Sequence, residues 1–221
     1  VVGGIPPPPP PPAPVERVWS YLIDPQMRGT WLAAGPMDLR IGGTVELRFD
    51  HARLSAEPTP ERFREYMNGH TQRGRVTACE PMKLLRFTWG EGGASVSEVS
   101  FALTARGAET HLVLTQRRLA DRNETVSVAS GWHTHLGILD DQLRGRVPRL
   151  FWSTHAALEA DYEQRIQRTE VTTMATLHHQ VWINAPVSKV YDALATADGL
   201  GAWWEPHTST QTDAGLVLAH N

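Results

Sequence analysis

The sequence predicts an α+β fold, in which an antiparallel sheet wraps around one long helix at the C-terminal end of a domain. Five short strand-like segments, each bounded by Gly, Pro or charged turn residues, follow one another between residues 44 and 117. After residue 122 apolar residues instead recur three and four positions apart, as in a helix that lies on a sheet. An internal repeat then indicates that the start of a second copy follows this domain.

Two short helices are expected before the first strand. Pro14 stands at the start of the first helix, a favoured place for proline, and the apolar residues after it share one face: Val15, Val18, Trp19 and Leu22. The second helix begins at Asp24-Pro25, with Asp24 as its N-cap and Pro25 as its first residue, and ends near Trp31.

The expected strands cover residues 44–50, 73–80, 83–89, 96–105 and 110–117. Alternation is clearest in the segment THLVLTQ, where Leu112 and Leu114 face the same side. The short connections between these strands predict an antiparallel meander. The exception is a polar connection at residues 51–72, with a short helix expected at 61–67. Loops of this length are often functional, although a plain surface excursion is the alternative.

The long helix is predicted from an apolar stripe formed by Val128, Trp132, Leu136, Leu139 and Leu143. Gly145 and Pro148 follow the stripe and are expected to end the helix. A further helix is expected at residues 151–166, because its apolar residues again recur with helical spacing.

The repeat joins two segments that lie 172 positions apart without a gap. The segment APVERVWSYLIDPQMRGTWL from Ala13 recurs as APVSKVYDALATADGLGAWW from Ala185. Such a period suits tandem domains better than a solenoid. We therefore expect a polyproline tail at 1–12, a domain at 13–166 that lacks its first strand, a linker at 167–177, and the truncated N-terminal part of a second domain at 178–221.

The two copies differ before the repeated segment. The second copy has the alternating, strand-like run HHQVWINAP, whereas the first has seven prolines from Pro6 to Pro12. Proline lacks the N–H that a sheet needs, so this tail is either a polyproline ligand for an SH3- or WW-like module or a disordered end. We expect the strand at 178–184 to dock on the open sheet edge of the first copy, within the chain or in a strand-exchanged homodimer.

Composition excludes several classes of function. A net charge of −3 gives no basic surface for nucleic acid, and there is no run of about 18 apolar residues that could span a membrane. Cys79 is the only cysteine, which excludes an internal disulfide and a multi-cysteine zinc site. No secretory signal is visible, so we expect a cytoplasmic protein.

A family resemblance is carried by the segments APVERVWSYLIDPQMRGTWL, IGGTVELRF, VTACEPMKLLRFTW and GWHTHLGILDDQL. Together they resemble the SRPBCC (START-like, helix-grip) superfamily, and above all bacterial proteins related to the activator of heat-shock protein 90 ATPase homologue. The resemblance covers residues 13–166 and again 178–221. It implies an apolar cavity between sheet and long helix. Members of the superfamily are ligand binders, a few cyclases or dehydratases, and co-chaperone-like proteins.

The candidate ligand site is aromatic. The residues expected to line the cavity, with those of the long loop at its mouth, are Trp31, Phe49, Tyr66, Met67, His70, Phe87, Trp89, Phe101, Trp132 and His135. Apolar pockets with few polar groups are how proteins hold small hydrophobic ligands. The alternative is that these rings fill the centre as ordinary core.

His135 is the one candidate for acid–base chemistry, because it lies beside the apolar stripe and could face the cavity. The alternative is a histidine at the edge of the core. His133 is two residues away, about 200° around a helix, so the two cannot share a metal ion. We expect His133 on the solvent side together with Asp140.

Other reactive residues lack the context that chemistry needs. His178 and His179 precede a strand and have no third ligand nearby, so no metal site is expected. Asp140 and Asp141 point apart on a helix and are expected to be solvated rather than a general acid–base pair. Cys79 has no basic neighbour to activate its thiol.

The sequence thus predicts a protein that binds a small hydrophobic molecule, with no defined catalytic set, cofactor or metal. Two alternatives stay open. One is a cyclase- or dehydratase-like enzyme that uses the same cavity with His135, and the other is a co-chaperone-like module that binds a protein partner. We expect a binding protein rather than an enzyme.

Overall fold

A computed structural model of the chain describes residues 13–92, 96–166, 175–182, 210–212 and 215–217. The polyproline tail and the repeated segment from Ala185 lie outside the described residues. The elements are α1 (Val15–Ile23), α2 (Pro25–Arg28), β1 (Thr44–Phe49), α3 (His51–Leu54), the 3-10 helix η1 (Glu61–Tyr66), β2 (His70–Glu80), β3 (Leu84–Thr88), β4 (Glu98–Arg106), β5 (Glu109–Leu119), α4 (Arg122–Leu143), α5 (Phe151–Arg165), β6 (Ala175–Trp182), β7 (Thr210–Thr212) and β8 (Gly215–Val217).

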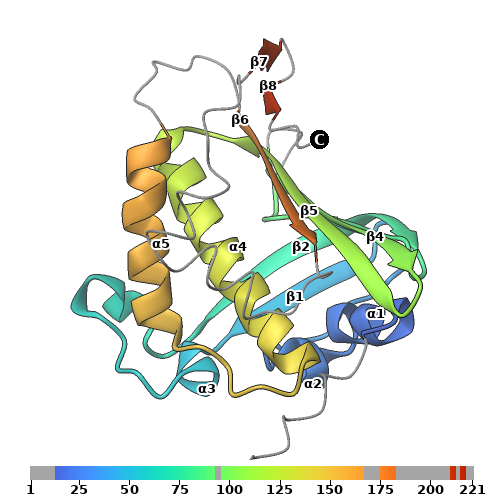
Figure 1. The fold of residues 1–221 in the computed structure, drawn as a ribbon, viewed down its shortest axis with the longest axis horizontal. Helices are drawn as coiled ribbons and strands as arrows, with labels where there is room; N and C mark the ends of the chain where they lie inside the picture. The colour runs from blue at the N-terminus through green and yellow to red at the C-terminus, as the bar shows by residue number, and fades with distance from the viewer. Residues whose placement is uncertain (1–12, 93–95, 167–174, 183–209, 213–214, 218–221) are drawn as a thin grey trace, which may run out of the picture.

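The main sheet is antiparallel and has the order β1-β2-β3-β4-β5-β6, so the predicted meander is confirmed. Buried positions alternate with more exposed ones along β4, where Val99, Phe101 and Leu103 are buried. A shift of register between Val76 and Ala78 bends β2. The result is a curved sheet with one buried face (Figure 1).

Strand β6 pairs with β5 and forms the last strand of the sheet. Its pairing is antiparallel and runs from Ala175 opposite Leu119 to Trp182 opposite His111. The predicted docking of this segment is therefore confirmed, and it occurs within the chain. A strand-exchanged homodimer stays a prediction.

The predicted boundary before this strand is wrong. The expected linker reached residue 177, but β6 begins at Ala175, and His178 and His179 lie inside the strand instead of before it. The sequence predicts a linker up to residue 177 because the residues before the strand are polar and rich in threonine. Threonine favours strands, however, and a sheet ladder needs only backbone groups.

Helix α4 lies across the buried face of the sheet, and α5 returns beside it (Figure 1). Four residues of the predicted apolar stripe of α4 are buried, with Trp132, Leu136, Leu139 and Leu143 at most 5% exposed, and the fifth, Val128, is half-buried. An Asp121 side chain caps the helix by accepting a hydrogen bond from the Glu124 N–H. The fold is therefore α+β with a long helix gripped by an antiparallel sheet.

The opposite face of α4 is covered by α5 and the loop before it, which corrects the expectation of a solvated face. Asp141 is 6% exposed and accepts hydrogen bonds from the backbone N–H and the guanidinium of Arg149. His133 Nδ1 lies 3.1 Å from the Tyr162 hydroxyl on α5. The apolar stripe of α4 identifies only the side that faces the sheet. The other side packs against α5 through pairs of polar residues, and a hydrophobic pattern does not reveal such pairs.

The short N-terminal helices close the end of the sheet near β1. Arg28 is 2% exposed, and its guanidinium donates hydrogen bonds to the carbonyls of Leu22, Ile23, Ala33 and Gly35. These bonds fold the chain after α2 back on itself and bury the residues that follow. Helix α2 ends at Arg28, three residues before the predicted end near Trp31.

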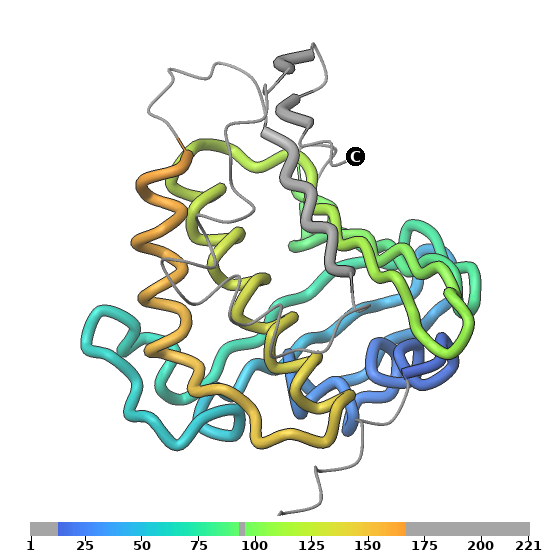
Figure 2. The backbone as a smooth tube through the Cα atoms, viewed as in Figure 1, coloured from blue at the N-terminus to red at the C-terminus, as the bar shows by residue number. Residues whose placement is uncertain are grey.

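Residues 50–69, here termed the covering segment, contain α3 and η1 and connect β1 to β2. Figure 2 shows this segment beside the first turns of α5, although almost a hundred residues separate them in the chain. The expected short helix is present as a 3-10 helix, whereas α3 was not expected. Among the described residues, no helix has the length and apolar character needed to cross a bilayer.

Candidate ligand-binding site

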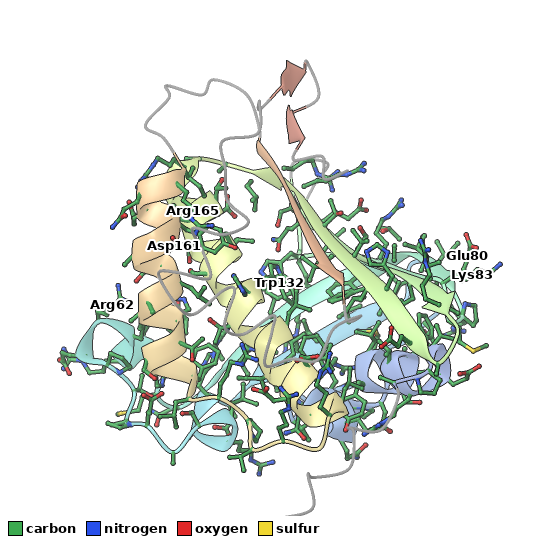
Figure 3. The ribbon with its side chains drawn as sticks, in the orientation of Figure 1. Arg62, Glu80, Lys83, Trp132, Asp161 and Arg165 are labelled. Carbon is green, nitrogen blue, oxygen red and sulfur yellow. The ribbon has the colours of Figure 1, made fainter. Side chains whose placement is uncertain are left out.

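The middle of the sheet is filled by aromatic rings that pack on one another. Trp132 reaches from α4 toward the sheet (Figure 3), with its ring centroid 5.6 Å from that of Phe101 and 5.2 Å from that of Trp89. Phe101 in turn lies 6.4 Å from Trp31 and 6.2 Å from Phe87. For these five residues the structure supports the alternative of ordinary core.

Two indole N–H groups of this central group, those of Trp31 and Trp132, have protein partners. The Trp132 indole N–H donates to Gln116 Oε1 at 2.6 Å, and the Gln116 amide donates to Ser97 at 3.0 Å. The Trp31 indole N–H donates to the Tyr21 carbonyl at 2.8 Å. These two buried indoles therefore have their hydrogen bonds satisfied within the protein.

Polar side chains gather where β1 ends and β2 begins. Four histidines from four elements converge there and are termed the histidine cluster: His51 of α3, His70 of β2, His135 of α4 and His155 of α5. The His51 ring lies 6.4 Å from His70 and 5.9 Å from His135, measured between centroids. His51, His135 and His155 are all buried, and His70 is half-buried.

Aromatic rings enclose the histidine cluster. Phe49 stacks on His70 at 4.5 Å, and Phe151 lies 4.5 Å from His51 and 5.0 Å from His135. The remaining rings in contact with the four imidazoles are Phe63, Tyr66, Trp132 and Trp152. The cluster is thus a small group of polar nitrogens within apolar walls.

Several polar atoms of this region are buried without a hydrogen-bond partner among the described residues. They are the Nδ1 atoms of His51, His70 and His155, and the indole nitrogen of Trp152. Such orphaned groups are rare in folded proteins. His135 differs, because its Nδ1 lies 2.7 Å from the Trp31 carbonyl and therefore carries the hydrogen and donates it.

Burial keeps these histidines uncharged near neutral pH. Desolvation lowers the pKa of His135 to about 3 and that of His51 to about 4. Desolvation also lowers the pKa of His70 and His155, although Glu65 and Glu159 respectively act in the opposite direction. At pH 7 each imidazole therefore offers one N–H donor and one acceptor nitrogen.

The covering segment is attached to the N-terminus of α5. Glu57 Oε2 accepts hydrogen bonds from the backbone N–H groups of Trp152 at 2.9 Å and Ser153 at 3.2 Å, and Ser55 accepts one from the Phe151 N–H at 3.1 Å. These side chains replace a local cap, because Leu150 at the N-cap position has no capping oxygen.

A second attachment lies about two turns further along α5. Arg62 forms an ion pair with Glu159 and stacks over Phe63, 4.5 Å from the ring centroid. Figure 3 shows Arg62 beside the helix. Phe63 in turn stacks on Trp152 at 5.0 Å, so this attachment also closes one side of the histidine cluster.

An open groove of about 900 Å³ lies on the other side of the cluster. It is lined by residues of α2, the following loop and the end of β1, with Gln142 of α4, and Phe49 is its aromatic residue. The charged residues Arg48 and Arg53 form ion pairs with Glu46 and Asp50. Phe49 also stacks on His70, so this residue belongs both to the lining of the groove and to the walls of the histidine cluster.

Comparison with known proteins assigns the family. Residues 12–144, which exceed half of the chain, match the sequence model of the activator of Hsp90 ATPase homolog 1-like (AHSA1-like) family. The chain belongs to this family. The suspected membership of the SRPBCC superfamily and the helix-grip fold are thereby confirmed. A search of curated proteins gave no match.

Two solved structures resemble the AHSA1-like domain. A protein of Bordetella parapertussis, solved by solution NMR, is 46% identical, with 70% of this chain and 81% of that chain covered and a TM-score of 0.62. CalU16 from Micromonospora echinospora is 24% identical, with 69% and 78% of the chains covered and a TM-score of 0.50. The second likeness concerns the fold alone.

The structure divides the predicted ligand residues of the AHSA1-like domain into three groups. Phe49, His70 and His135 meet at the histidine cluster, and Tyr66 lies 4.9 Å from His70 beside it. Met67 is 56% exposed on the surface of the covering segment. The core group, packed away from solvent or half-buried, comprises Trp31, Phe87, Trp89, Phe101 and Trp132.

Sequence reasoning missed the residues that complete the cluster: His51, Phe63, Phe151, Trp152 and His155. One signal was available, since Phe151 and His155 are four residues apart and share a helix face. His51 has no such signal, because its position depends on the unexpected helix α3. No group of three or more metal-binding side chains suited to an ion occurs among the residues that the structure describes.

Proposed function

We propose that this AHSA1-like domain binds a small, hydrophobic, ring-containing molecule at the histidine cluster. The observation that carries the proposal is the set of four buried polar atoms without protein partners inside walls of aromatic rings. A buried polar group left unsatisfied costs about 1–3 kcal/mol. A ligand that offers hydrogen bonds to these atoms regains that energy and buries its own apolar surface.

We propose that the ligand reaches the cluster through the open groove. Its volume of about 900 Å³ falls in the range of small-molecule pockets, and Phe49 lines the groove while it stacks on His70. On this route Phe49, which is 6% exposed, changes its side-chain rotamer to admit the ligand. The covering segment stays attached to α5 during this step.

The test uses N-phenyl-1-naphthylamine, an uncharged compound whose fluorescence increases when it leaves water. We expect saturable binding to the wild-type protein and its loss in His51→Trp, because the larger indole occupies the space beside Phe151. Ile41→Trp is the matched control, since Ile41 is 78% exposed and outside the cluster. Saturable binding that is equal in all three proteins refutes the proposed site, and no binding to any of them refutes the function.

Binding is favoured over the enzyme alternative by the state of His135. A base with a pKa of about 3 accepts a proton poorly at neutral pH, so His135 is unsuited to general acid–base work there. Its Nδ1 is moreover engaged with the Trp31 carbonyl. Native mass spectrometry of the purified protein separates binding from the co-chaperone alternative, because a retained small molecule supports the first.

A further inference from the structure

The chemistry of the histidine cluster restricts the kind of ligand that it can bind. A neutral imidazole donates from one nitrogen and accepts at the other, whereas the indole of Trp152 only donates. The Trp152 N–H donates, and each orphaned Nδ1 donates or accepts according to its tautomer, so a ligand group that does both satisfies these atoms in either tautomer. A hydroxyl group has both capacities in one atom, while a carboxylate only accepts and an ammonium only donates.

The surroundings do not favour a charged ligand. The charged groups that act on the cluster are Asp50, Glu65 and Glu159, which are acidic, and Arg62, which is basic. Arg62 is already paired with Glu159, so no cation is left to balance a bound anion. A bound cation has no free buried carboxylate among these groups, because Asp50 is paired with Arg53, Glu159 is paired with Arg62 and Glu65 is exposed. Burial of an unpaired charge is costly.

The walls favour a flat, unsaturated ligand. Phe49 and His70 lie nearly parallel, with an interplanar angle of 3°, and Phe63 and Trp152 lie at 21° to each other. Phe151 and His155 form a third stacked pair at 20°. Aromatic side chains interact with further rings through offset-stacked or edge-to-face contacts, beyond the energy of area burial.

On these grounds, which rest on the proposed function, we infer that the ligand is an uncharged hydroxylated aromatic compound, that is, a phenol. Its ring lies among Phe49, Phe151 and Trp152, and its hydroxyl exchanges hydrogen bonds with the Nδ1 of His51 and with neighbouring orphaned atoms. The low pKa of His51 and His135 supports this assignment, because both imidazoles stay neutral at pH 7.

The test compares three compounds that share one ring system: 2-naphthol, naphthalene and 2-naphthoate. Dissociation constants are measured at pH 7 by equilibrium dialysis. One net hydrogen bond changes affinity by a factor of about two to ten. We therefore expect 2-naphthol to bind about tenfold more tightly than naphthalene, and 2-naphthoate to bind more weakly than both.

Two variants place the hydroxyl. His51→Phe keeps a ring against Phe151 but removes both nitrogens, so 2-naphthol and naphthalene should then bind equally. His133→Phe is the matched control, because this histidine is already bonded to Tyr162 on the opposite face of α4 and should keep the tenfold difference. Urea unfolding of each variant establishes that it is folded.

The outcomes separate the two claims. If naphthalene binds the wild-type protein as tightly as 2-naphthol, the phenol assignment is wrong and the proposed function stands. Tightest binding of 2-naphthoate also overturns the assignment and indicates an anion site. If neither uncharged compound binds, both the assignment and the proposed function fail.

Discussion

Replacing Glu57 by alanine removes the carboxylate that joins the covering segment to α5. In the wild-type protein Glu57 Oε2 accepts two backbone N–H groups at the start of the helix, at 2.9 and 3.2 Å, and a hydrogen bond from Ser55 at 3.2 Å. An N-capping oxygen contributes about 0.5–2 kcal/mol, and a negative charge at a helix N-terminus about 0.3–1 kcal/mol. We expect Glu57→Ala to lower the free energy of unfolding by about 2 kcal/mol.

The assay is urea denaturation at pH 7 followed by far-UV circular dichroism. Glu57→Gln keeps an acceptor oxygen but not the charge, so its loss should be about half as large. Glu61→Ala is the control, because that carboxylate is 78% exposed and pairs only with Arg64, and its loss should stay below about 0.5 kcal/mol. The reasoning is refuted if Glu57→Ala and Glu61→Ala give the same free energy of unfolding.

The same carboxylate predicts a pH dependence. Burial acts to raise the pKa of Glu57, but the hydrogen bonds from Ser153, Trp152 and Ser55 outweigh it and hold the pKa below its usual value. The stabilisation is therefore fully present above the ordinary glutamate pKa and is lost as the pH falls through the lower, folded-state value. The difference between wild type and Glu57→Ala should shrink accordingly at acid pH.

Three further predictions concern the core, the histidines and the sheet edge. Trp132→Phe leaves Gln116 without its indole donor and should cost about 2–3 kcal/mol in urea unfolding, whereas adding Gln116→Leu should recover part of that loss; no recovery contradicts the paired role. Because burial lowers the pKa of His135 to about 3, its neutral form contributes stability that is present above about pH 6.5 and declines by up to about 1.4 kcal/mol per pH unit below it; a histidine NMR titration with a normal midpoint would exclude this. Deletion of residues 170–221 removes β6 and should lower the melting temperature, while deletion of 183–221 retains β6 and should not; equal effects would disprove the role of the strand.

The sheet and the long helix were predictable because each follows from a periodic pattern. The apolar stripe on α4 and the alternation in β5 reflect burial on one face, and local periodicity records that directly. The repeat also indicated the origin of β6, since the segment from His178 has strand character that the prolines in the first copy lack. The start of β6 did not follow from the pattern, because polar residues such as Thr176 extend the ladder through their backbone groups.

The histidine cluster was only half predictable. His135 and Phe49 lie on elements whose buried faces could be recognised, so both were expected at one site, and their ring centroids lie 6.1 Å apart. His51 and His155 come from α3 and α5, and their proximity depends on how the covering segment attaches to α5 through Glu57. That contact spans 95 residues of the chain. Local sequence patterns contain no information about such a contact.

The central claim is that the histidine cluster binds an uncharged ring-containing molecule. The most direct measurement is a side-chain ¹H–¹⁵N NMR spectrum of the protein with ¹⁵N-labelled histidine, recorded during titration with N-phenyl-1-naphthylamine. We expect saturable chemical-shift changes of the ring nitrogens of His51, His70 and His155, while those of His133 stay unchanged. Saturable binding that leaves the nitrogens of the histidine cluster unmoved would contradict it.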